Sequence, residues 1–173
     1  MRLFVSVDLP DSFADRIAAI QKDLEVADGL RFTDPSQAHI TLKFLGDTTS
    51  ERVPQITEEL GRAVQAANVD PFRARLQDIG VFPSLDYISV LWIGVDDGSS
   101  QLTTLHQSIE EAMVNLGFEE EEHDFTPHAT IARMDYAEGK SFVQNYVTDN
   151  EPEVGEMHVT EIRLKESELT DEG

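Results

Sequence analysis

The sequence predicts a compact domain of mixed α and β structure, in which a strand–helix–strand–helix–strand unit occurs twice. Alternating and helical spacings of apolar residues follow one another in the same order in both halves of the chain. No Gly/Ser-rich or Pro-rich linker separates the halves. The length of 173 residues, 40% of them hydrophobic, suits one domain with a sizeable core. We therefore expect a single domain over residues 1–173, with two pseudo-symmetric lobes at roughly residues 1–83 and 84–173.

The first half is expected to contain three extended segments and two helices. Its strands are indicated by apolar residues at every second position, and its helices by apolar residues at every third or fourth position. The expected elements are a strand at residues 3–8, a helix opened by residues 10–12 and ending near residues 28–29, a strand at residues 39–46, a helix started by Ser50 and Glu51, and an extended segment at residues 72–82.

The second half repeats this order of elements. β-branched and aromatic residues are frequent in its first strand, and Gly117 is placed to end its long helix. The expected elements are a strand at residues 87–95, a helix capped by Ser99 or Ser100 and running to Leu116, a strand at residues 128–133, a short helix at residues 142–147 and a closing strand at residues 157–164.

The chain carries 34 acidic against 13 basic side chains and a formal net charge of −21. Phosphate binding normally depends on clustered Lys and Arg, so this charge argues against long-range steering of nucleic acid. The acidic residues are spread along the chain, and only 4 of the basic residues are Lys. Such a surface is typical of a halophilic protein, because a Debye length of about 3 Å in molar salt screens self-repulsion. An ordinary acidic mesophilic protein is the alternative.

Cysteine is absent, which excludes a disulfide framework, a thiolate zinc site and a cysteine nucleophile. No segment approaches the roughly 18 consecutive apolar residues that a membrane-spanning helix needs. Residues 1–8 are too short and too alternating for a signal peptide. We therefore expect a cytoplasmic, monomeric protein that binds no membrane.

The third element of each half begins with the pattern His-x-Thr, at His39 and Thr41 and again at His128 and Thr130. Side chains at positions i and i+2 of a strand point to the same face of the sheet. Each half therefore presents an imidazole and a hydroxyl from one rigid strand. If the halves pack about a pseudo-twofold axis, the two pairs face each other across one cleft.

Two opposed imidazoles suit the hydrolysis of a phosphodiester. With an ordinary pKa of about 6.5, histidine occurs in both protonation states near neutral pH. One imidazole can take a proton from water while the other, charged, gives a proton to the leaving oxygen. Threonine hydroxyls can donate hydrogen bonds to the non-bridging phosphate oxygens. We expect His39 and His128 to be catalytic and Thr41 and Thr130 to bind substrate, with no metal and no cofactor.

With these two motifs, the sequence resembles the LigT-like branch of the 2H phosphoesterases. These are RNA 2′,3′-cyclic phosphodiesterases that are also described as 2′-5′ RNA ligases. The resemblance covers essentially the whole chain, and two His-x-Thr motifs in order with matching flanks make it specific. The residues that carry it are the segments 2–10, 39–46, 80–83, 90–95 and 126–133, followed by Leu164, Ser167, Leu169 and Thr170.

The resemblance implies a bilobal α+β fold with two antiparallel sheets around a central cleft. The implied reaction opens a terminal 2′,3′-cyclic phosphate of RNA, or of a cyclic nucleotide, to a 2′-phosphomonoester. His39 then corresponds to the proton donor to the 3′-oxygen, and His128 to the base that activates water. The family also joins a cyclic-phosphate end to a 5′-hydroxyl as a 2′-5′ linkage.

Several other polar residues have an ordinary interpretation. Arg133 could bind phosphate, but strict alternation sends it to the face opposite His128 unless a bulge or strand end re-aims it. Lys43 falls on the His39 face and is interpreted as a solvated side chain. A third match, His158-Val159-Thr160, has no counterpart in the first half, so His158 is interpreted as a surface or edge-strand residue. The remaining interpretations are an exposed helix position for His106, a loop position for His123, a solvated acidic loop at residues 119–122, and core positions for Phe4 and Trp92.

Three alternatives to an RNA-end phosphodiesterase stay open. The same chemistry could act on a small cyclic nucleotide or a nucleotide-sugar phosphate. The chain could also be an RNA-binding module that holds such ends without turnover, or a catalytically idle scaffold. Rates on a cyclic mononucleotide and on oligonucleotide ends separate the first alternative from the main hypothesis, and product formation separates the other two.

Overall fold

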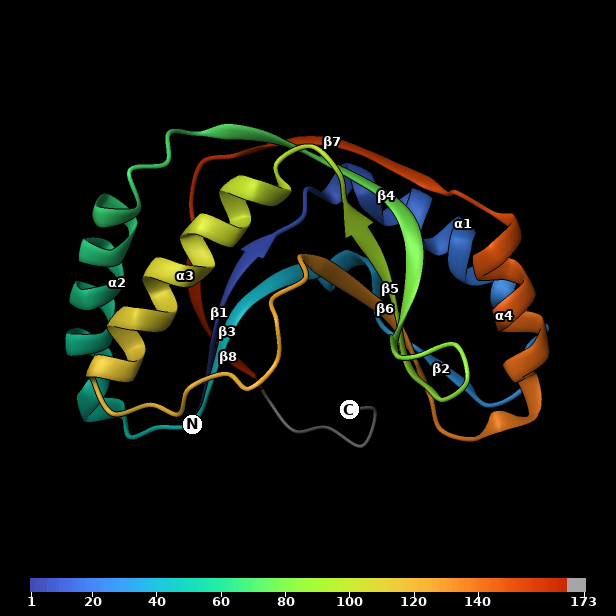
Figure 1. Ribbon diagram of the computed structural model, residues 1–173, viewed down its shortest axis with the longest axis horizontal. Coiled ribbons are helices and arrows are strands. Elements are labelled where there is room, and N and C mark those ends of the chain that lie inside the picture. The colour runs from blue at the N-terminus through green and yellow to red at the C-terminus, as the bar shows by residue number, and fades with distance from the viewer. Residues whose placement is uncertain (168–173) are drawn as a thin grey trace.

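The computed structural model describes residues 1–167, which form four α-helices and one eight-stranded antiparallel sheet (Figure 1). The predicted α+β class and the four helices are confirmed. Leu169 and Thr170 of the family resemblance lie outside the described residues. The helices are α1 (Ala14–Leu24), α2 (Val53–Ala67), α3 (Ser99–Asn115) and α4 (Lys140–Asp149). The strands are β1 (Arg2–Asp8), β2 (Leu30–Phe32), β3 (His39–Asp47), β4 (Phe72–Pro83), β5 (Ile88–Val95), β6 (His128–Met134), β7 (Glu153–Val159) and β8 (Arg163–Ser167).

The expectation of two antiparallel sheets is wrong, because the strands join in one sheet with the order β7-β4-β5-β6-β3-β1-β8, and β2 pairs with β6. Strands β7-β4-β5-β6 form one part of the sheet and strands β3-β1-β8 the other, and only a short pairing joins the two parts. It is made where β3 pairs with β6, at Ile40 and Ala129. These two residues stand one position after His39 and His128, so the predicted motifs lie where the two parts of the sheet meet.

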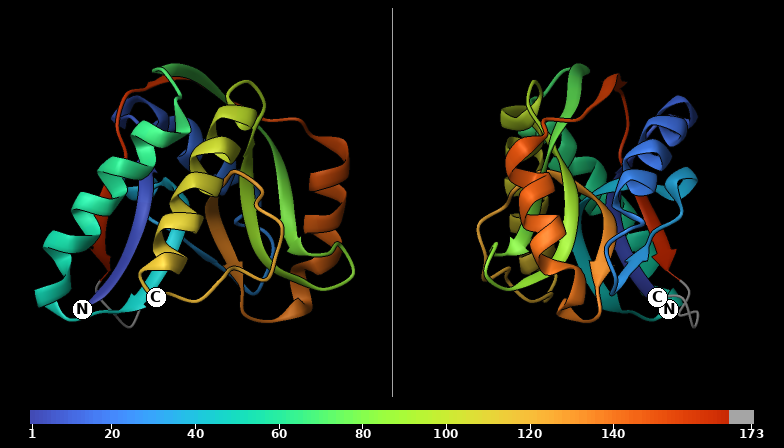
Figure 2. Two further views of the ribbon diagram at one scale, coloured as in Figure 1. Left: turned by 60° about the vertical axis from the view of Figure 1, so that its left-hand side comes forward. Right: turned by 90° about the vertical axis from the view of Figure 1, so that its right-hand side faces the viewer.

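The closing strand predicted at residues 157–164 is two strands at opposite ends of the sheet. β7 pairs with β4, whereas β8 pairs with β1, and residues 160–162 carry the chain from one to the other (Figure 2). The apolar alternation changes phase between Val159 and Ile162, which marks a break in the strand but does not show which strand each part pairs with.

The first helix ends at Leu24, which is earlier than predicted. The amides of Glu25 and Ala27 donate to the carbonyls three residues before them, so the chain tightens into turns after Leu24. The short strand β2 that follows was not predicted, because its three residues are too few to show an alternating pattern in the sequence. It is defined by its pairing with β6.

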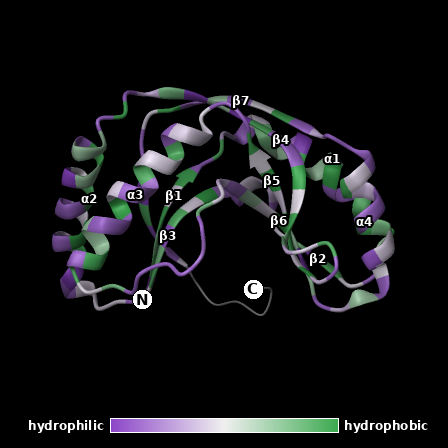
Figure 3. Cartoon of the chain, viewed as in Figure 1, coloured by the Kyte–Doolittle hydropathy of each residue, from purple (hydrophilic) through white to green (hydrophobic). Residues whose placement is uncertain are grey.

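The helices lie in two pairs, α2 with α3 on one side of the molecule and α1 with α4 on the other (Figure 1). Helix α2 packs beside α3, and α3 also packs on β3, whereas α1 packs on β6 and β7 (Figures 1 and 2). Figure 3 shows hydrophilic residues along the outer side of α2, as expected for a helix with one face in the core. No helix within residues 1–167 is long and apolar enough to cross a membrane.

The two halves of the sequence are interleaved in space. Strand β4 of the first half lies between β5 and β7 of the second half, and β8 of the second half pairs with β1 of the first. One core cluster contains buried residues from both halves, while the single domain over residues 1–173 stays a prediction. The division into pseudo-symmetric lobes at residues 1–83 and 84–173 stays a prediction.

Candidate active site

The two His-x-Thr segments lie side by side in the middle of the sheet. Ile40 and Ala129 form the pair between β3 and β6, and both side chains are 0% exposed. Ile40 also pairs with Val7 and Ala129 with Ile93, which are buried as well. These residues therefore define the core-facing side of the sheet.

The four predicted residues lie on the opposite side. Because directly paired residues of an antiparallel sheet share a face, the register places His39 opposite Thr130 and Thr41 opposite His128. All four side chains are half-buried. The structure thus brings two imidazoles and two hydroxyls together on one face, while their catalytic and binding roles stay predictions.

Both histidines are oriented in the same way. His39 Nδ1 lies 2.9 Å from the carbonyl oxygen of Gln37, and His128 Nδ1 lies 2.6 Å from that of Thr126. A carbonyl oxygen only accepts hydrogen bonds, so each Nδ1 carries a proton and donates it. This leaves Nε2 of each ring to exchange a proton with a substrate or water.

Burial lowers the pKa of both histidines below the ordinary value of 6.5. The hydrogen bonds to the carbonyls of Gln37 and Thr126 oppose this effect only in part. The positive charge of Lys165 lowers the pKa of His39 further, against the negative charge of Asp8. A positive charge on His39 also lowers the pKa of His128. One charged and one neutral imidazole is therefore favoured over two charged ones, and an acid/base pair needs that state.

Aromatic rings lie beside both imidazoles. The Phe4 ring lies 5.1 Å from the His39 ring between centroids. Around His128, the Phe82 ring stands edge-on at 4.9 Å and the Trp92 ring lies at 5.8 Å. A side chain at Gly80 would collide with the Trp92 ring, because a Cβ there would lie 2.4 Å from it. Phe4 and Trp92, interpreted from the sequence as core residues, thus lie next to the candidate catalytic rings.

A β-bulge re-aims Arg133. Thr130 pairs with Trp92, but Ala132 pairs with Leu91, so Ile131 is the extra residue on β6. Ile131 and Ala132 are both buried, and the alternation resumes one residue later. Arg133 then pairs with Val90 on the same face as Trp92, and so on the face of His128. Its substrate-binding role stays a prediction.

A buried glutamine supports this bulge. Gln21 of α1, which is 7% exposed, donates from Nε2 to the carbonyl of Ile131 at 3.0 Å and to that of Thr33 at 2.8 Å. The amide of Thr33 also donates to the Ile131 carbonyl at 3.1 Å, and its hydroxyl donates to the Thr130 carbonyl at 3.2 Å. The backbone of the second motif is therefore held from the helix side.

The interpretation of Lys43 as a solvated side chain is wrong. Thr41 pairs with Ser6 and Lys43 with Val5, so Leu42 is an extra residue that turns Lys43 to the helix side. There the Lys43 side chain is 3% exposed and its Nζ lies 2.9 Å from a carboxylate oxygen of Glu110. Nζ also donates to the backbone carbonyl of Glu119 at 2.7 Å.

His106 is buried rather than exposed, which also corrects the sequence interpretation. Its Nδ1 lies 2.8 Å from the carbonyl of Leu42, and its ring stacks on Phe125 at 4.1 Å. His106 and Lys43 together fix the loop that leads to the second motif. The other two histidines lie as expected, His123 in an exposed loop and His158 exposed on the edge strand β7.

Sequence reasoning missed a charged group beside His39. Asp8 pairs with His39, and its carboxylate accepts a hydrogen bond from Lys165 Nζ at 2.6 Å and lies 3.7 Å from Arg163 Nε. Burial raises the pKa of Asp8, but the hydrogen bonds and charges of its neighbours outweigh burial and lower it overall. Alternation in β1 places Asp8, Ser6 and Phe4 on one face, but only the pairing with β8 brings Lys165 to them.

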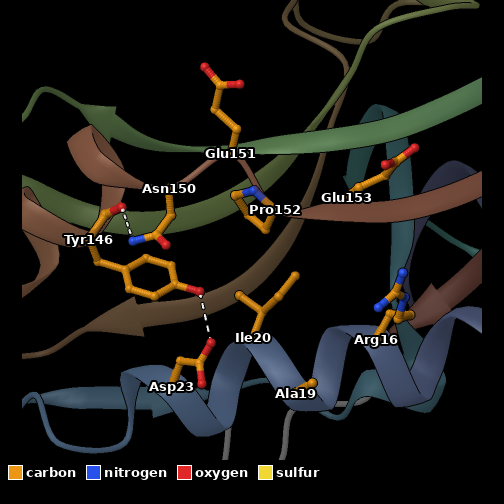
Figure 4. Close-up of a pocket in the computed structure, with 9 residues that line it drawn as sticks. All are labelled: Arg16, Ala19, Ile20, Asp23, Tyr146, Asn150, Glu151, Pro152 and Glu153. Carbon is orange, nitrogen blue, oxygen red and sulfur yellow. Dashed lines mark hydrogen bonds between the residues drawn. The ribbon is translucent and has the colours of Figure 1, made fainter.

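A separate groove of about 310 Å³ lies between α1 and α4 (Figure 4). Its polar contacts include the hydrogen bond from the Tyr146 hydroxyl to Asp23 at 3.2 Å. None of the candidate site residues lines it. Within residues 1–167, no group of three or more His, Cys, Asp or Glu side chains is arranged to hold a metal ion.

Residues 9–170 match the model of a protein family described as the 2′-5′ RNA ligase superfamily. The chain is 35% identical to an RNA 2′,3′-cyclic phosphodiesterase of Archaeoglobus fulgidus, over 100% of this chain and 94% of that protein. It is 33% identical to an RNA 2′,3′-cyclic phosphodiesterase of Methanothermobacter thermautotrophicus, over 100% of this chain and 93% of that protein.

Solved structures share this fold. A Thermus thermophilus protein superimposes with a TM-score of 0.81 at 27% identity, over 100% of this chain and 92% of that one. Escherichia coli LigT in complex with 3′-AMP superimposes with a TM-score of 0.75 at 25% identity, over 94% of this chain and 86% of that one. The resemblance noted in the sequence is thereby confirmed.

Proposed function

Because this chain belongs to the 2′-5′ RNA ligase superfamily, we propose that it hydrolyses 2′,3′-cyclic phosphate ends of RNA to 2′-phosphomonoesters. The observation that carries the proposal is the placement of His39 and His128 on one face of the sheet, each with its Nε2 left to exchange a proton. The activity in the names of the two full-length relatives supports the same substrate class.

In the proposed reaction, the oxygen of a water molecule attacks phosphorus and the bond from phosphorus to the 3′-oxygen breaks. His128 Nε2 takes the proton of the water, and charged His39 Nε2 gives a proton to the 3′-oxygen. The assignment of base and acid comes from the family resemblance. The hydroxyls of Thr41 and Thr130 and the guanidinium of Arg133 stabilise the charge on the non-bridging oxygens. No metal takes part in these steps.

The same groups could join RNA ends. If a ribose 5′-hydroxyl replaces water, His128 takes the proton of that hydroxyl and the product is a 2′-5′ linkage. We propose this ligation as a second outcome of the same site. Its extent depends on whether the 5′-end can displace water from the face that holds the two histidines.

We further propose that the protein is a halophilic, monomeric, cytoplasmic enzyme. Its acidic residues outnumber basic ones by 34 to 13. The proposed duplication into lobes at residues 1–83 and 84–173 is supported by matched details. In both motifs the histidine Nδ1 meets the carbonyl of the second residue before it, and the bulge occurs three residues after it.

The test is product analysis of an oligonucleotide that ends in a 2′,3′-cyclic phosphate, at low and at molar salt, with and without EDTA. The proposal expects a 2′-phosphomonoester, equal rates with and without the chelator, and full activity in molar salt. A 3′-phosphomonoester would contradict the assigned reaction, and loss of turnover in EDTA would contradict the metal-independent mechanism. Binding without any product would favour an RNA-end-binding module.

A further inference from the structure

Two arginines stand directly opposite each other on the face of the sheet that carries the histidines. Arg31 of β2 pairs with Arg133 of β6, and paired residues of an antiparallel ladder share a face (Figure 1). The bulge at Ile131 turns Arg133 to the face of His128, so Arg31 lies on that face as well. Sequence reasoning missed Arg31, because the three residues of β2 show no alternation.

The opposition of two arginines is unfavourable in the protein alone. Like charges directly opposite each other destabilise an antiparallel pair. The chain has 34 acidic and only 13 basic side chains, so a chance neighbour of an arginine is more often an acid. On α2, for example, Arg62 contacts Glu58 and Glu59 at 2.8 Å each. Two opposed guanidinium groups suit a ligand that brings two negative charges, such as two phosphates.

Arg31 is held by a weak partner that a phosphate can replace. Its Nε lies 3.3 Å from one carboxylate oxygen of Asp135, and its Nη2 lies 3.5 Å from the other. The two side chains are 39% and 50% exposed. An exposed ion pair with such long hydrogen bonds contributes little to stability, so the exchange of Asp135 for a phosphate costs little.

The backbone beneath Arg31 is fixed on both sides of β2. The amide of Asp135 donates to the carbonyl of Gly29 at 2.8 Å. At the other end, Thr33 donates from its amide to the carbonyl of Ile131 at 3.1 Å and from its hydroxyl to that of Thr130 at 3.2 Å. Arg31 therefore stands on a fixed part of the sheet, which lowers the entropic cost of ordering it around a ligand.

Arg31 also lies on the same side of β6 as His39. Strand β5 occupies one edge of β6, so β3 and β2 lie one after the other along its other edge. In the proposed reaction, His39 gives its proton to the 3′-oxygen, which belongs to the ribose of the terminal nucleoside. The ribose, and with it the phosphate on its 5′ carbon, therefore extends along the edge that carries His39 and Arg31.

We propose that Arg31 binds the phosphate on the 5′ side of the terminal nucleoside, while Arg133 serves the cyclic phosphate. The substrate is then a nucleotide with a phosphate on both sides of its ribose, either the end of an RNA strand or a 5′-phosphorylated cyclic nucleotide. A cyclic nucleotide with a free 5′-hydroxyl lacks the group that Arg31 recognises. The proposal rests on the proposed phosphodiesterase function and assigns its substrate class.

The test measures kcat/KM on three substrates that all end in a 2′,3′-cyclic phosphate: a nucleoside with a free 5′-hydroxyl, the same nucleoside with a 5′-phosphate, and a dinucleotide. Wild-type protein should prefer the second and third substrates to the first. Arg31→Ala should lower kcat/KM on these two about tenfold more than on the first, as expected for the loss of a charged hydrogen-bond donor to phosphate. The larger of the two losses shows whether the site takes the phosphodiester of an RNA strand or a terminal phosphate.

Two further variants separate phosphate binding from an effect on folding. Asp135→Asn removes the carboxylate that competes for Arg31, and should raise kcat/KM on the two substrates with a 5′-phosphate group about two- to fivefold. Arg62→Ala is the matched control, because it removes the same charge from the surface of α2, and it should leave all three rates unchanged.

An equal loss on all three substrates in Arg31→Ala would overturn the proposal, as would unchanged rates in that variant. A lower rate of Asp135→Asn on the substrates with a 5′-phosphate group would overturn it as well. Wild-type protein that cleaves none of the three substrates would instead refute the phosphodiesterase function.

Discussion

Replacing Gln21 by leucine tests how the core holds the second motif in place. The side chain is buried, and the substitution removes both hydrogen bonds to the carbonyls of Thr33 and Ile131. Ile131 keeps the amide of Thr33 as a donor, so only the Thr33 carbonyl loses its side-chain donor without a replacement. At about 1 kcal/mol for each bond and a further cost for the carbonyl, Gln21→Leu should lower the free energy of unfolding by about 2–3 kcal/mol.

This loss corresponds to a fall of about 5–10 °C in Tm for a domain of this size. Urea denaturation measures it, and kcat/KM on the cyclic-phosphate oligonucleotide should fall as well, because the bulge that aims Arg133 loosens. Gln144→Leu is the control, since Gln144 donates a single hydrogen bond from the surface of α4 to Leu85. A change of less than about 0.5 kcal/mol in Gln21→Leu, or one equal to the control, would refute this reasoning.

Three further predictions concern the buried lysine, pH and salt. Lys43→Met removes the partner of the partly buried Glu110 carboxylate and should lower the free energy of unfolding by about 3 kcal/mol. Urea denaturation measures this change, and an unchanged midpoint of the unfolding curve would contradict it. Burial lowers the pKa of His39 and His128, so their contribution to stability is complete above pH 6.5 and is lost as the pH falls below that value. Urea titrations at pH 7.5 and 5.5 should show this loss, smaller in His39→Gln, and equal losses in both proteins would contradict it. Raising KCl from 0.1 to about 2 M should raise Tm because the charge of −21 is then screened, and a fall in Tm would contradict the salt adaptation.

Local patterns in the sequence were sufficient to predict the four helices and most strands. They also predicted that the histidine and threonine of each motif share one face of the sheet. Alternation placed His39 beside Thr41 and His128 beside Thr130, because the spacing of side chains along a strand does not depend on its neighbours. The repeat then separated these histidines from His158, which lies exposed on an edge strand.

The remaining features depend on contacts between distant segments. Strict alternation places Lys43 on the face of the two histidines, but the bulge at Leu42 turns it to the helix side. Strict alternation places Arg133 on the helix side, but the bulge at Ile131 turns it to the face of the histidines. A bulge is set by the partner strand and the packing beneath it, so a single strand sequence does not reveal it. The joining of the sheet at Ile40 and the split of residues 157–164 between two edges are non-local in the same sense.

The pair of histidines on one face is the centre of this account, and turnover of three variants tests it most directly. His39→Ala and His128→Ala should each lower kcat on the cyclic-phosphate oligonucleotide by about 10²-fold or more. The double variant should lose little more than the weaker single variant, because an acid and a base that serve one phosphorus act as a unit. Turnover close to that of the wild-type protein in either single variant would contradict the account.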